Sequence, residues 1–264
     1  MILDHTTVLT YSSYLALDEV LTAQRPRTRE HDEVLFIVIH QVHELWFKQL
    51  LHEFAELQQR LALGDSGRVL HTLRRSLGIL KLVVAQVDVL ETMTPPQFTA
   101  FRDALGSASG FQSAQFREVE AVLGRRDRQV LGRYDEGSAE RYRIEAAMNR
   151  PSLFDSLLGY LAIHGYPIPG ELLRRDVSLP IEQSEAVREA LRAVYTDDGL
   201  PAQVCEGLIE LDERLQEWRY RHVKMVERII GFKTGTGGSS GAPHLRAGVF
   251  TPMFPDLWAV RCDL

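Results

Sequence analysis

Residues 31–61 contain neither proline nor glycine, and their apolar side chains recur at steps of three and four residues. This period places the apolar side chains on one face of an α-helix, whereas a half-buried strand would alternate apolar and polar residues. The sequence therefore predicts one unbroken helix of about 46 Å, at roughly 1.5 Å per residue. The rest of the fold has to be arranged around an element of that length.

A second helical pattern covers residues 66–93 and stops before Thr94-Pro95-Pro96. Proline removes a hydrogen-bond donor there and disfavours the α region for the residue before it. The turn around Leu63-Gly64-Asp65 joins the two helices, which predicts an antiparallel pair. Shorter helices are expected at residues 95–105, 114–123, 138–147 and 153–164, and another after Pro180 as far as Tyr195.

The last long helix is expected at residues 201–232. Its core seam advances by alternating steps of three and four, through Leu208, Leu211, Leu215, Trp218, His222, Met225 and Ile229. No series of alternating apolar and polar runs bounded by turn residues is present, so strands are not expected. We therefore expect an all-α helical bundle that forms one domain over residues 1–264.

Charge and composition exclude several classes of protein. The chain has 30 Lys and Arg against 36 Asp and Glu, and its net charge of −6 argues against nucleic-acid binding or docking on an anionic membrane. No run of about 18 apolar residues and no signal peptide are present, so a cytoplasmic protein is expected. Cys205 and Cys262 form no CxxC pair, which excludes zinc ribbons, thioredoxin-like redox pairs and covalent c-type haem attachment.

Nine histidines raise the question of a metal site. Neither the HExxH motif nor the Glu-x-x-His pattern of di-iron bundles occurs, which disfavours zinc-protease and di-iron chemistry. The only His-x-acid triplet is His31-Asp32-Glu33, at a helix start where acidic residues are expected because of the helix dipole. It is weak support for a non-haem iron site.

Residues 235–241 read GTGGSSG and follow the last long helix. A phosphate-binding P-loop would need glycine directly before Lys233-Thr234, where Phe232 stands, and a dinucleotide fingerprint would need glycine in place of Ser240. Two interpretations remain: a helix stop with a flexible loop, or a mobile loop that closes over a small polar ligand.

Two histidines occupy apolar faces of different long helices. Phe36, His40 and Phe47 share one face of the first, and His222 lies on the seam of the last. A histidine among apolar residues is more often a hydrogen-bonded core residue than a catalytic group. Together, however, the two predict a haem slotted between bundle helices with one axial imidazole. His43 and His52 are expected on a solvated or subunit-facing surface.

Five phrases spread through the chain carry a family resemblance. They read LTYSSYLALDEVLTAQ, LFIVIHQVHELWFKQLLHE, MTPPQFTAFRDALGSASGFQSAQFRE, WRYRHVKMVERIIGFKTGTGGSSGAPHLR and FPDLWAVRCDL. Together they resemble the tryptophan 2,3-dioxygenases, in order from about Leu9 to the C-terminus. The resemblance implies an all-α, homotetrameric enzyme of tryptophan catabolism by the kynurenine pathway. Such an enzyme uses ferrous haem b and O₂ to open the pyrrole ring of L-tryptophan, giving N-formylkynurenine.

The resemblance also implies roles for residues around the haem. His222 matches the proximal ligand of the haem iron, and Trp218 lies one turn before it. His40 matches the distal histidine that accepts the indole N–H. Ser109 is implied near the haem edge.

Other residues match positions that bind the substrate. Arg102 matches the guanidinium that holds the carboxylate, because its planar fork donates two parallel hydrogen bonds. Thr236 matches the hydroxyl that meets the amino-acid head group when the loop closes. Phe36 and Phe98 match aromatic walls of the indole pocket, and Tyr11 and Tyr14 match tyrosines lent by a neighbouring subunit.

Three departures from the family pattern keep alternatives open: His43, His244, and Ala242-Pro243 at the end of the closing loop. Relatives of this fold also insert a single oxygen atom into modified tryptophans such as β-methyltryptophan. A haem sensor or carrier is the competing class, but a sensor would have no use for an amino-acid clamp. The retention of Arg102, Thr236 and both tyrosines therefore favours catalysis.

Overall fold

Every regular element in the described part of the chain is a helix, as the sequence predicts. The computed structural model describes residues 9–231, 233, 242–246 and 248–264. The α-helices are α1 Tyr11–Tyr14, α2 Leu17–Leu21, α3 His31–Ala62, α4 Ser66–Leu90, α5 Pro95–Arg102, α6 Ala114–Leu123, α7 Ala139–Met148, α8 Leu153–Ile163, α9 Gly170–Leu173, α10 Glu185–Asp197, α11 Leu200–Ile230, α12 Ala242–Arg246 and α13 Pro255–Ala259. Short 3₁₀ helices are η1 Asp103–Leu105, η2 Gly110–Gln112, η3 Arg128–Arg133 and η4 Val260–Asp263.

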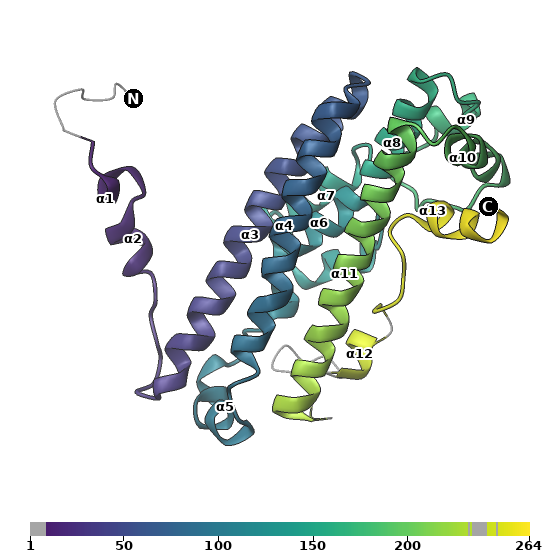
Figure 1. Ribbon diagram of the computed structural model, residues 1–264. Coiled ribbons are helices and arrows are strands. Elements are labelled where there is room, and N and C mark those ends of the chain that lie inside the picture. The colour runs from purple at the N-terminus through teal and green to yellow at the C-terminus, as the bar shows by residue number, and fades with distance from the viewer. Residues whose placement is uncertain (1–8, 232, 234–241, 247) are drawn as a thin grey trace.

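Three long helices, α3, α4 and α11, run side by side and form the frame (Figure 1), with α4 packed against both of the others. The turn between α3 and α4 uses Gly64 at a φ of 68°, and Asp65 caps α4 by accepting a hydrogen bond from the Arg68 N–H at 3.1 Å. Gly207 permits the close approach of α11 to α4, because a Cβ there would lie 2.9 Å from Leu73 Cδ1. The buried side chains between these helices form the main core.

The expected helices agree with the observed ones except at their ends. The second long helix stops at Leu90 rather than at residue 93, and the helix from Pro95 continues past Arg102 only as the 3₁₀ turn η1. The last long helix ends at Ile230, because Gly231 takes a φ of 63° that suits glycine alone. The helix expected after Pro180 begins only at Glu185 and ends at Asp197.

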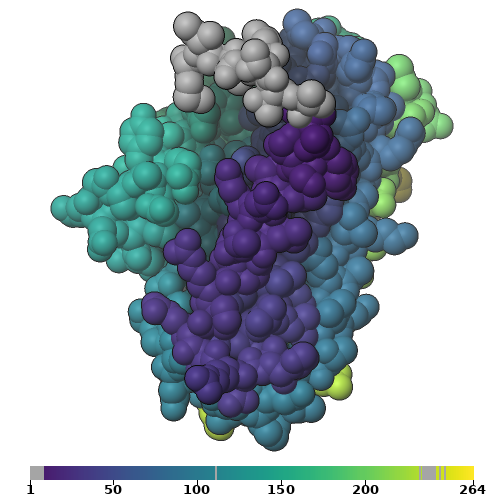
Figure 2. Space-filling view, turned by 90° about the vertical axis from the view of Figure 1, so that its left-hand side faces the viewer, coloured from purple at the N-terminus to yellow at the C-terminus, as the bar shows by residue number. Residues whose placement is uncertain are grey.

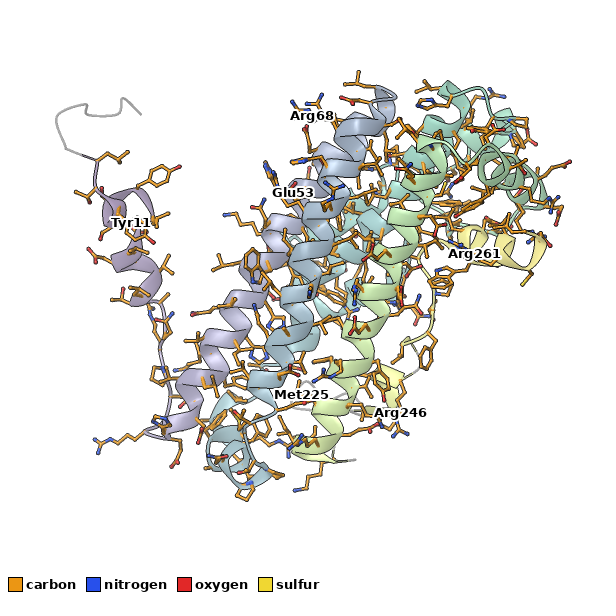
Figure 3. All side chains as sticks on the ribbon, in the orientation of Figure 1. Tyr11, Glu53, Arg68, Met225, Arg246 and Arg261 are labelled. Atoms are coloured by element: carbon orange, nitrogen blue, oxygen red, sulfur yellow. The ribbon has the colours of Figure 1, made fainter. Side chains whose placement is uncertain are left out.

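The N-terminal arm, α1 and α2, stands apart from the long helices (Figure 1) and is the element nearest the viewer in Figure 2. Its base is fixed because the Glu33 carboxylate accepts hydrogen bonds from the backbone N–H groups of Arg27 and Thr28, both at 2.7 Å. Tyr11, labelled in Figure 3, is 75% exposed and Tyr14 is 72% exposed. The arm therefore does not fold back onto its own bundle.

The C-terminal segment is tied to α11 by one buried carboxylate. Asp212 Oδ2 accepts hydrogen bonds from the backbone N–H groups of Met253 and Phe254, at 2.8 and 3.2 Å, and from Trp258 Nε1 at 2.9 Å. Burial strengthens these bonds and makes the loss of any one of them costly. Asp212 therefore fixes the entry into α13. None of the described helices is both long and apolar enough to span a membrane.

Candidate functional site

Three adjoining cavities meet at His222 on α11, with volumes of about 270, 110 and 70 Å³. His222 and Gly110 of η2 line all three. His40 of α3 lines the two smaller ones, and Met225 of α11, labelled in Figure 3, also lines both. Because α3 and α11 flank α4, side chains from both helices reach the same space. The two histidines singled out by sequence therefore face one site.

His222 is held as a neutral imidazole. Its ring stacks on Trp218, one turn earlier, with ring centroids 5.3 Å apart and planes inclined by 8°. Burial and, to a lesser extent, the positive charges of the nearby His40, His43 and Arg117 together lower the pKa of His222 to about 4. At neutral pH the ring therefore carries a nitrogen lone pair, which is the form that binds a metal ion.

His40 presents a hydrogen-bond acceptor to the cavity. Its Nδ1 lies 2.7 Å from the backbone oxygen of Phe36, and because a carbonyl only accepts, Nδ1 carries the proton. Burial lowers the pKa of His40 below its ordinary value and outweighs the opposing effect of that carbonyl. In the neutral ring Nε2 is left as an acceptor that can receive a ligand N–H.

Helix α5 supplies the opposite wall of the 110 Å³ cavity. Pro95 at its first turn and a capping box between Thr94 and Gln97 fix its start. Phe98 and Arg102 are four residues apart and therefore share the inner face of the helix, where both line this cavity. Ser109 lines it as well.

Phe36 packs against His40 at this cavity and against two further aromatic rings. The Phe36 ring centroid lies 4.1 Å from that of His40, 5.8 Å from that of Phe98 and 5.6 Å from that of Phe101. Such a wall suits a flat apolar ring, and the polar groups of the lining are one guanidinium, two imidazoles and the Ser109 hydroxyl. The arrangement therefore fits an aromatic amino acid whose carboxylate reaches Arg102.

The 270 Å³ cavity is polar and rich in arginine. Glu120 is buried at its edge and accepts hydrogen bonds from Arg117 at 2.6 Å, Arg125 at 3.1 Å and Arg219 at 2.9 Å. Burial raises the pKa of Glu120, but Arg117, Arg219 and Arg125 together hold it below its ordinary value. Three guanidinium groups thus surround one carboxylate, and the excess positive charge suits an anionic group.

Two buried donors in these cavities, Trp218 Nε1 and Arg117 Nε, have no hydrogen-bond partner in the described part of the chain. An unpaired buried donor costs free energy of about 1 to 3 kcal/mol, so each is expected to meet a ligand. No three His, Cys, Asp or Glu side chains of the described residues form a metal-binding cluster. The residues therefore fit a large, planar, carboxylate-bearing cofactor with one imidazole ligand, such as haem, better than a metal held by side chains alone.

The expectation for His43 was wrong, whereas His52 is exposed as expected. His43 is half-buried and lines the 70 Å³ cavity. It lies three residues after His40 and so shares its helix face, and Trp218 of α11 covers it with ring centroids 6.4 Å apart. Its Nδ1 lies 2.8 Å from the Ile39 oxygen, and burial lowers its pKa.

The structure does not bring the remaining predicted residues together with this site. Tyr11 and Tyr14 are on the exposed arm, and Thr236 lies outside the described residues. The sequence analysis did not identify Glu120 or the arginines that pair with it. The spacing of Arg117 and Glu120, three residues apart on the expected helix 114–123, could have indicated an ion pair. Arg219 lies far away in the sequence, and only the packing of α6 against α11 brings it to Glu120.

Comparison with known proteins identifies relatives over the whole chain. The family model for tryptophan 2,3-dioxygenase matches residues 3–152 and 149–264. A tryptophan 2,3-dioxygenase of Anaeromyxobacter sp. (strain K) is 62% identical over 257 residues, which cover 97% of both chains. That of Herpetosiphon aurantiacus is 56% identical over 97% of this chain and 98% of its own. Tryptophan 2,3-dioxygenase 1 of Ralstonia nicotianae is 38% identical over 99% of this chain and 90% of its own.

Proposed function

The chain belongs to the tryptophan 2,3-dioxygenase family, and from that membership we propose that it is a haem-dependent dioxygenase of L-tryptophan. Its reaction opens the pyrrole ring with O₂ and gives N-formylkynurenine. The observation that carries this proposal is the pairing of two neutral histidines, His40 and His222, across one cavity that Arg102 also lines. We also propose that residues 1–264 act as one domain in the cytoplasm.

The cofactor is proposed to be haem b with ferrous iron in the active state. His222 would be its sole protein ligand, with Trp218 stacked behind the imidazole. Arg117 and Arg125, on the polar side, would pair with its carboxylates. When bound, the haem supplies oxygen activation, which leaves binding, orientation and the exclusion of competing reactions to the protein.

Substrate binding is proposed to use three kinds of contact. Arg102 would pair with the carboxylate through two parallel hydrogen bonds, and Phe36 and Phe98 would hold the indole between them. His40 Nε2 would accept the indole N–H, which selects against analogues blocked at that nitrogen because a buried acceptor would then be left unpaired. Ser109 would lie near the haem edge.

Further groups are proposed to complete the site. Thr236 would meet the amino-acid head group when its loop closes. Tyr11 and Tyr14 would come from a neighbouring subunit of a homotetramer, because both are exposed on an arm that leaves its own bundle. Insertion of one oxygen atom into a modified tryptophan is not favoured, since the relatives are named tryptophan 2,3-dioxygenases. A sensor has no use for the carboxylate clamp.

The test is to incubate reduced, haem-loaded protein with L-tryptophan and O₂ and to weigh the product. A gain of two oxygen atoms is expected. A gain of one atom would support the single-insertion alternative instead. No product, together with a haem absorption spectrum that tryptophan leaves unchanged, would support the sensor.

A further inference from the structure

A fourth cavity, of about 340 Å³, lies among α8, α10, α13 and the segment around α9. These helices gather at the end of the molecule opposite α5 and α12 (Figure 1), and the cavity shares no residue with the three around His222. Its volume is in the range of small-molecule pockets. Nothing in the proposed reaction uses it.

A buried carboxylate with one unpaired oxygen lines this cavity. Asp256 is 0% exposed, and its Oδ1 accepts a hydrogen bond from the Ser184 N–H at 3.0 Å. Its Oδ2 is buried and has no hydrogen-bond partner among the residues that the structure describes. Ser184 is the N-cap residue of α10, and its N–H bonds to Oδ1 only. No hydrogen bond within the described residues therefore compensates for the burial of Oδ2. Burial raises the pKa of Asp256 above its ordinary value and outweighs the opposing effects of the Ser184 N–H and the Arg188 guanidinium.

Among the described residues, one guanidinium lines the cavity, that of Arg175, and it is already occupied. Arg175 pairs with both oxygens of Asp155, at 2.7 and 3.1 Å, and its Nη1 donates to the backbone oxygens of Asp176 and Leu179, at 3.1 and 2.9 Å. It therefore has little capacity for an anionic ligand. The other charged side chains of the lining, Asp176, Glu182 and Asp256, are all acidic, so the cavity favours a cation.

The rest of the lining is largely apolar. Phe154 is buried at the cavity wall and stacks against Phe254 with ring centroids 6.3 Å apart. Leu158 and Val187 are also buried, and Leu172 is half-buried on α9. A ligand that fits must therefore present an apolar, ring-sized body together with one positively charged head.

We propose that this cavity is a second ligand site, which takes a small primary amine with an aromatic or aliphatic body, its ammonium group donating to Asp256 Oδ2. An ammonium group carries three N–H donors, and one of them would supply the hydrogen bond that Asp256 Oδ2 lacks within the described residues. The site differs in chemistry from the proposed catalytic pocket, where Arg102 selects a carboxylate.

Phenethylamine and hydrocinnamate test the proposal, because they share a phenyl body and carry opposite charges. Each is titrated into haem-loaded protein that is saturated with L-tryptophan and kept free of O₂. Binding is measured by ligand-observed saturation-transfer NMR, and the haem absorption spectrum shows whether either compound enters the proposed catalytic pocket. The expected result is that phenethylamine binds at one site with an unchanged haem spectrum, and that hydrocinnamate does not bind there.

Two variants locate the binding. Asp256→Asn keeps an oxygen for the Ser184 N–H and should weaken phenethylamine binding by at least about tenfold, while Glu182→Gln at the rim should change it by less than about threefold. Leu172→Trp keeps Asp256 but fills the cavity with a larger side chain, so it should abolish phenethylamine binding. This variant replaces Asp256→Asn as the test if Asp256→Asn does not fold. Absence of phenethylamine binding to the unaltered protein, equal binding of the two probes, or full binding to Leu172→Trp would overturn the proposal.

Discussion

Burial sets the protonation state of the two central histidines, and this state decides their chemistry. His222 would be unable to bind a metal ion as an imidazolium, and protonated His40 would have no acceptor for an indole N–H. The desolvation of both rings favours the neutral form at neutral pH. The same apolar helix faces that build the core therefore prepare both residues for their proposed roles.

Replacing His222 with alanine is expected to abolish the normal haem absorption spectrum and the activity, because no other residue is proposed to hold the iron. The measurement is the haem content and spectrum of the purified variant. His52→Ala is the matched control, since His52 is exposed on α3 and should leave both unchanged. Haem binding by the His222 variant like that of the unaltered protein would contradict the assignment.

Replacing Arg102 with lysine keeps the charge but removes the planar fork that matches a carboxylate. We expect kcat/KM for L-tryptophan to fall by at least about tenfold, or roughly 1.4 kcal/mol of transition-state stabilisation. The binding of indole, which has no carboxylate, should hardly change. Steady-state kinetics and an indole titration measure the two effects, and equal losses for both ligands would refute the anchor role.

Among the elements, the long helices were predictable because their apolar period extends over many turns. The helices α9, α12 and α13 were not predicted, since four or five residues are too few to show a period. In the site, His40, Phe36, Phe98, Arg102 and His222 were found from sequence, largely through the family resemblance. Their meeting in one cavity, and the inward position of His43, depend on how α3, α5 and α11 pack.

Asp212 is expected to hold the C-terminal segment on α11. Asp212→Asn replaces a charged acceptor of three N–H groups with a neutral amide, so the free energy of unfolding should fall by about 2 kcal/mol. Denaturant unfolding measures this. Glu213→Gln, at the exposed neighbouring position, should change stability by no more than about 0.5 kcal/mol. Equal stability of the two variants would show that Asp212 is not an anchor.

At the scale of the whole molecule, the exposed arm favours an oligomer. Leu9, Tyr11, Tyr14 and Leu21 expose more apolar surface than a free arm of this length should. If the proposed tetramer forms through this arm, deleting the residues before Thr22 is expected to dissociate it and to weaken tryptophan binding while haem is retained. Light scattering measures the oligomeric state, and a tryptophan titration measures substrate binding. If the full-length enzyme were monomeric and fully active, Tyr11 and Tyr14 could not complete the site of a neighbouring subunit.

The most direct test of the proposed activity is turnover of L-tryptophan under a mixture of fully labelled and unlabelled O₂. A dioxygenase places both atoms of one O₂ molecule in the same product. The product is therefore expected to carry either two labelled oxygen atoms or none, as read by mass spectrometry before exchange with water. A product with one added oxygen, or a large share of singly labelled molecules, would contradict the proposal.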